Sequence, residues 1–130
     1  MDDIDARDRT LAVVAESLYL ANLTLLPGVA FAILAVLWCR HAGSSGVLGR
    51  NHLRQTFWVS LYGGMLIVLV TAAVIVLLGQ IHGSTAAWVA AILYFTCIHS
   101  TLLLLGVAGL ARALAGQNFR YPVIGPRLVP

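Results

Sequence analysis

His99 is the first side chain that could carry out chemistry, because it is an ionisable group within a long apolar run. An ionisable group inside a membrane segment is costly and is therefore a candidate for function. His99 could ligate haem or a metal ion, or relay protons. Cys97 lies about 200° away around a helix of about 3.6 residues per turn, so the two cannot ligate one ion together. Because a second ligand at matched depth is missing, we expect no cofactor and a neutral His99 bonded to Asn22, Thr96 or a backbone carbonyl.

Glu16 and Asn22 are the other polar side chains expected inside the membrane. At about 1.5 Å of rise per residue, Glu16 lies about 8 Å, Asn22 about 16 Å and His99 about 20 Å from the outer face. Asn22 and His99 are therefore expected at similar depth. Glu16 is either a proton or cation site, or a carboxyl near the rim that meets His82 or Thr85. The sequence favours the rim carboxyl.

The sequence holds no constellation for nucleophilic catalysis, phosphate binding or nucleic-acid recognition. The stretch from Cys39 to His41 is too short for a zinc site, which needs four ligands. The stretch GVLGRN lacks the Lys-Ser/Thr that follows a phosphate-binding loop. We therefore expect no catalytic residue, no metal site and no nucleic-acid partner.

Composition indicates the elements that carry these side chains. Of 130 residues, 60% are hydrophobic and 10% are charged, against about 25% charged in ordinary globular domains. Runs of about 20 apolar residues predict membrane-spanning helices. We predict one all-α domain, residues 1–130: an integral membrane bundle of three helices over about 11–38, 57–78 and 86–110. A short interfacial tail, 113–130, completes it.

Two features refine this bundle. Pro27 should kink the first helix near its middle, because proline removes a backbone donor. Residues 47–55 could form an interfacial helical turn that runs into the second helix.

The arginines predict the orientation, because cytoplasmic loops carry the excess of positive charge. Three spans would put Arg7 and Arg9 on one side and the other six arginines on the opposite side. We therefore predict a bacterial inner-membrane protein with the N-terminus outside and the C-terminus in the cytoplasm. The residues expected at the lipid headgroups are Arg50, Arg54, Arg120, Tyr121 and Arg127.

The tail sequence GQNFRYPVIGPRL resembles the closing motif of a family of small three-helix bacterial membrane proteins of unknown function. That family is similar to the chloroplast inner-envelope protein-import component and to magnetosome membrane proteins. The motif is a Gly, an acidic or amide residue, an aromatic residue and then Arg-Tyr-Pro. Phe119, Arg120, Tyr121 and Pro122 supply its last four positions.

The family's second landmark is a His followed by a basic residue, just before the second helix. The stretch RNHLRQTFW supplies these as His52 and Arg54, with Asn51 where members commonly carry Glu. The resemblance implies a three-helix inner-membrane protein and does not imply an enzyme.

Both motif segments are expected on the same face. We predict that the tail packs against the start of the second helix, with Tyr121 or Phe119 close to His52, Phe57 or Trp58. Ordering the tail requires contacts that outweigh about 1–2 kcal/mol of backbone entropy per residue. Arg120 is expected to reach a lipid phosphate or a carbonyl at the end of the first or third helix.

The sequence favours a non-enzymatic accessory or scaffold subunit that packs in the lipid bilayer against other membrane protein subunits. One alternative is a transport or translocation element, which would have to act as an oligomer because three helices cannot enclose a pore. The other is a haem- or metal-binding redox protein that uses His99.

Overall fold

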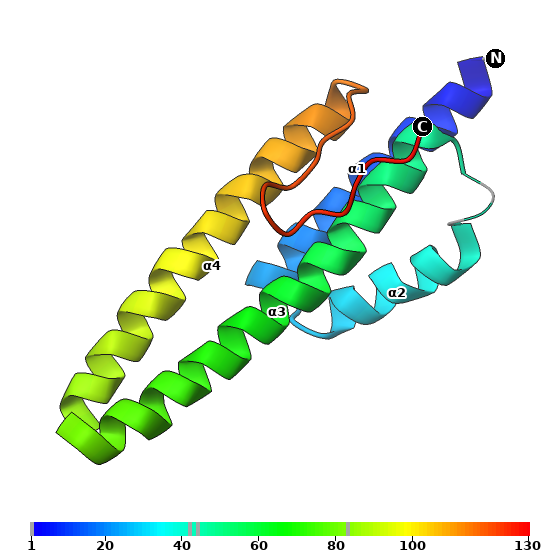
Figure 1. Ribbon diagram of the computed structural model, residues 1–130. Helices are drawn as coiled ribbons and strands as arrows, with labels where there is room; N and C mark the ends of the chain where they lie inside the picture. The colour runs from blue at the N-terminus through cyan, green and yellow to red at the C-terminus, as the bar shows by residue number, and fades with distance from the viewer. Residues whose placement is uncertain (1, 42, 44, 83) are drawn as a thin grey trace.

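The computed structural model describes residues 2–41, 43, 45–82 and 84–130, without the side chains of 2–4, 81, 82 and 84. Within these ranges the protein is all-α. Its four helices are α1 (Asp2–Thr24), α2 (Val29–His41), α3 (Val47–His82) and α4 (Ser84–Leu114). Figure 1 shows α3 and α4 as a long hairpin, with α1 along one half of it and α2 turning back beside α1.

The chain reverses direction where a kink was predicted. α1 ends at Thr24 and α2 begins at Val29, because Pro27 has no backbone donor to continue the helix. Gly28 adopts a φ of 83°, which a residue without Cβ tolerates. Asn22 Oδ1 accepts the Gly28 N–H at 2.9 Å and closes the turn. The prediction of one helix over 11–38 is therefore wrong.

The second predicted helix is longer than expected. α3 begins at Val47, so the interfacial turn predicted over 47–55 is its first part. The carboxylate of Asp8, from α1, accepts the backbone N–H groups of Leu48 and Gly49, each at 3.0 Å. These donors have no partner within the helix, so Asp8 fixes where α3 starts.

α3 and α4 are both long and apolar enough to cross a membrane. Their 36 and 31 residues correspond to about 54 Å and about 46 Å at 1.5 Å per residue. A hydrocarbon core is about 30 Å thick, so each helix extends well beyond one span. The predicted ranges 57–78 and 86–110 fall inside them.

The two termini lie at the same end of the hairpin (Figure 1). Arg9, near the start of α1, donates to the carbonyl of Leu114 at the end of α4, and Asp8 binds the start of α3. The predicted topology, with the termini on opposite sides, is therefore wrong. Its basis was a continuous first span, which the turn at Pro27 removes.

This reversal brings the arginines together. All eight lie within about the first eight residues of α1 or α3, in the last turn of α2 or α4, or in the tail. None lies near the turn between α3 and α4. We call the end that carries them the arginine end.

Two groups of buried apolar side chains hold the arginine end together. One joins α1, α3, α4 and the tail through Tyr19, Val59, Leu102 and Tyr121. The other joins α1, α2 and α3 and is centred on Ala15, Leu34 and Leu53. The tail therefore belongs to the core.

Candidate functional site

Glu16 lies at the centre of a buried polar cluster at the arginine end. Its Oε1 is 2.6 Å from Nδ1 of His52 on α3, and its Oε2 accepts the hydroxyl of Tyr121 at 2.6 Å. All three side chains have 0% exposure. We call Glu16, His52 and Tyr121 the Glu16 cluster. It joins α1, α3 and the tail at one point.

The hydrogen bonds fix the protons of this cluster. His52 Nε2 is 3.0 Å from the carbonyl of Gln117, which can only accept, so Nε2 carries a proton. The short contact between Nδ1 and Glu16 Oε1 needs one further proton. The His52 and Glu16 side chains therefore share a single proton and form a pair without net charge.

Burial decides where that proton is held. Burial raises the pKa of the Glu16 carboxyl, and this outweighs the opposing hydrogen bonds from His52 and Tyr121. A buried carboxyl favours its neutral form because the charged form loses its hydration. Burial and the neighbouring Glu16 also raise the pKa of the Tyr121 hydroxyl. Tyr121 is therefore a fixed hydrogen-bond donor.

Gly109 on α4 lets the cluster form. A Cβ at this position would lie 2.5 Å from Glu16 Oε2 and 2.9 Å from the Tyr121 hydroxyl. Neighbouring Gly106 similarly admits the ring of Tyr19, whose hydroxyl donates to the carbonyl of Leu102 at 3.0 Å. α4 thus closes the fourth side of the site.

The tail is bound along α3 by two amide side chains. Asn51 accepts the N–H of Val129 at 2.8 Å and donates to its carbonyl at 3.0 Å. Gln55 accepts the N–H of Tyr121 at 3.2 Å and donates to the carbonyl of Pro126 at 2.5 Å. Asn51 and Gln55 lie one helical turn apart on α3. Their bonds to the tail confirm the prediction that the tail packs against the start of the second predicted helix.

The remaining tail residues follow this path. Phe119 packs edge-on against Tyr121, with ring centroids 5.0 Å apart. Arg54 donates to the carbonyl of Arg127 at 3.4 Å. Arg120 Nε contacts the carbonyl of Gly125 within the tail at 3.4 Å. Of the two partners expected for Arg120, the carbonyl at the end of a helix is therefore wrong, and the lipid phosphate stays a prediction.

Pro122 and Arg50 complete the set of predicted tail and interface residues. Pro122 is exposed and begins the turn that leads to Gly125. Arg50 is partly buried and donates to the carbonyl of Pro130 at 3.1 Å, so it binds the end of the tail.

Glu16 does not lie at the rim opposite the arginines. The prediction that it meets His82 or Thr85 is wrong, because the N-terminal end of the first helix lies beside the start of α3 and the end of α4 and not beside the turn between them. His52 was singled out from its motif and Glu16 from its charge. The signal that could have joined them is that a buried carboxyl requires a partner.

His99 and Asn22 are not paired. Asn22 closes the turn at Gly28, and the half-buried ring of His99 stacks on Phe95 at 5.0 Å. No hydrogen bond joins the two in the described part of the chain. Both instead line a lateral groove of about 510 Å³, beside Ser60 and Gly64.

The arrangement is suited to holding segments together. A substrate could reach the Glu16 cluster only if the tail came away, since its three side chains have no exposed surface. Among the side chains that the structure describes, no group of three His, Cys, Asp or Glu could hold a metal ion. The cluster therefore acts as a buried clamp on the tail.

Fold and site define a class: an all-α protein with two helices of membrane-spanning length and a C-terminal tail clamped at one end. No protein-family model, curated protein or solved structure matches the chain.

Proposed function

We propose that this protein is a non-enzymatic accessory or scaffold subunit of a larger complex in the bacterial inner membrane. The α3–α4 hairpin crosses the bilayer, and the arginine end lies in the cytoplasm. All eight arginines at one end support this orientation, because positive charge is retained on the cytoplasmic side. Both termini are then cytoplasmic.

The observation that carries the subunit role is the lateral groove where α1 stops. Beyond Thr24, α1 no longer covers α3 and α4, and the groove has an apolar wall with small residues at Gly28, Ser60 and Gly64. Small residues allow close approach of a neighbouring helix within a membrane.

Site-directed photocrosslinking in membranes tests this role. A crosslinking residue at Met65, which lines the groove, should capture one defined membrane subunit that also copurifies in mild detergent. The control is Leu104, which is 70% exposed on α4 and does not line the groove. Equal crosslinking from both positions, or none from Met65, would contradict the proposal.

The same experiment separates the transport alternative. A transport element of this size must form a closed homo-oligomer, so Met65 would then crosslink to a second copy of the chain. Reporter fusions at both termini test the orientation separately. A terminus that is active only outside the cytoplasm would refute it.

A further inference from the structure

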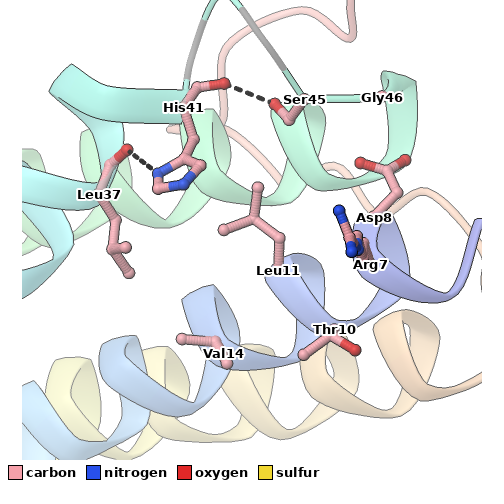
Figure 2. A pocket seen from close by; sticks show the side chains of 9 residues that line it. All are labelled: Arg7, Asp8, Thr10, Leu11, Val14, Leu37, His41, Ser45 and Gly46. Atoms are coloured by element: carbon pink, nitrogen blue, oxygen red, sulfur yellow. Dashed lines mark hydrogen bonds between the residues drawn. The ribbon is translucent and has the colours of Figure 1, made fainter. Parts of the chain in front are cut away.

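A second cavity, of about 660 Å³, lies between α1, α2 and the start of α3. We call it the α1–α2 pocket (Figure 2). It lies at the arginine end and involves neither the Glu16 cluster nor the lateral groove. Leu11, Val14 and Leu37 form its apolar wall. Its volume lies within the range of about 300–1,000 Å³ that is usual for small-molecule sites.

Most of the polar groups in this pocket are already bonded. Both carboxylate oxygens of Asp8 accept N–H groups at the start of α3. The hydroxyls of Thr10 and Ser45 each donate to a backbone carbonyl four residues earlier. These three side chains therefore shape the pocket and are not free to bind a ligand.

Arg7 and His41 remain. His41 Nδ1 is 3.3 Å from the carbonyl of Leu37, so it is the donor of that bond. The ring edge with Nε2 is then turned toward Leu11 (Figure 2). Arg7 forms no hydrogen bond or ion pair with the residues that the structure describes. Judged by the side chains that the structure describes, the polar groups of this pocket without a bond are the Arg7 guanidinium and the Nε2 atom of His41.

The outer face of α2 indicates what lies beside the pocket. Val29, Ile33 and Val36 are exposed on it, and a row of large apolar side chains suits contact with lipid tails. His41, at the other end of α2, then lies near the headgroup layer. In the orientation proposed above, the pocket opens where charged headgroups and acyl chains meet.

We propose that the α1–α2 pocket binds one anionic phospholipid. Arg7 donates to the phosphate, and His41 donates to it through Nε2–H when the ring is doubly protonated, since Nδ1–H is already given to Leu37. The first part of an acyl chain lies along Leu11, Val14 and Leu37. This inference rests on the proposed membrane location. A soluble phosphate ester offers the same charged group but leaves the apolar wall uncovered.

Native mass spectrometry of the full-length protein in a neutral detergent tests the proposal. The probes are dioleoyl phosphatidylglycerol, the matched phosphatidylcholine and inorganic phosphate. We expect one phosphatidylglycerol to be retained in preference to phosphatidylcholine. Arg7→Gln should weaken the binding of phosphatidylglycerol about fivefold, the factor for one arginine near a charged lipid. Adding His41→Gln to Arg7→Gln should weaken this binding further. Arg112→Gln is the control, because Arg112 is exposed at the same end and does not line the pocket; it should leave binding unchanged.

Three results would overturn the proposal that the α1–α2 pocket binds an anionic phospholipid. These are equal loss in Arg112→Gln, equal retention of phosphatidylcholine, and displacement of the lipid by millimolar inorganic phosphate, which would indicate a site for soluble phosphate. Carbonate extraction separates the two proposals. A protein that carbonate removes from membranes contradicts the proposed function. A protein that stays in membranes but does not prefer phosphatidylglycerol contradicts the pocket alone.

Discussion

Replacing Tyr121 with phenylalanine should raise the population of undocked tail while leaving the apolar packing intact. The Tyr121 ring packs against Tyr19 at 5.3 Å and against Phe119 at 5.0 Å between centroids, and phenylalanine preserves both contacts. The lost hydroxyl leaves Glu16 Oε2 without its donor at a position with 0% exposure. An unsatisfied buried polar group costs about 1–3 kcal/mol.

This cost translates into a measurable population of undocked tail. At about 1.4 kcal/mol per factor of ten, the open fraction should rise about fivefold to about a hundredfold. Trypsin cleaves after arginine, so Arg120 and Arg127 report opening of the tail. When opening and closing are fast relative to cleavage, the cleavage rate follows the open population.

The assay is limited proteolysis of the purified protein in mild detergent, read by intact mass. Tyr62→Phe is the matched control, because Tyr62 is 48% exposed on α3 and lies outside the Glu16 cluster. It should be cleaved at the wild-type rate. If Tyr121→Phe is also cleaved at the wild-type rate, the bond from the Tyr121 hydroxyl to Glu16 does not help to hold the tail, and this role of the Glu16 cluster is refuted.

Three further predictions concern the same end of the protein. Gly109→Ala should lower the free energy of unfolding by about 1–3 kcal/mol through overpacking. Gly64→Ala is the control and should not lower it, since nothing lies within 4 Å of its added Cβ. Thermal unfolding in detergent compares the two variants. Burial raises the pKa of Glu16 in the folded state, so the folded protein holds the Glu16 proton more tightly than the unfolded chain does. The stability that this proton contributes is complete below the unfolded pKa of about 4.3. It is lost as the pH rises through the folded-state pKa, by up to about 1.4 kcal/mol per pH unit. Glu16→Gln should flatten this pH dependence of the unfolding midpoint, and an unchanged slope would show that another group titrates. Asp8→Ala should cost about 0.5–2 kcal/mol as the loss of a helix cap and should speed amide exchange in the first turn of α3, whereas the exposed Asp5→Ala should do neither.

Much of this protein follows from its sequence. Apolar runs over 57–78 and 86–110 identify the two long helices, because only an extended apolar stretch suits a membrane span. The motif segments around His52 and Tyr121 were correctly predicted to meet. Three prolines and the tail's short length require an external surface to order it, and the amides of Asn51 and Gln55 provide that surface.

The tertiary structure alone decided the course of the first run and the environment of Glu16. Pro27 is compatible with either a kinked span or a reversal, since its missing donor breaks the helix in both cases. The reversal depends on distant contacts, with Asp8 capping α3 and Arg9 reaching the end of α4. Once α1 runs parallel to α3, Glu16 faces His52 across the helices. Local sequence cannot specify this pairing, because it depends on the direction in which two separate helices pack.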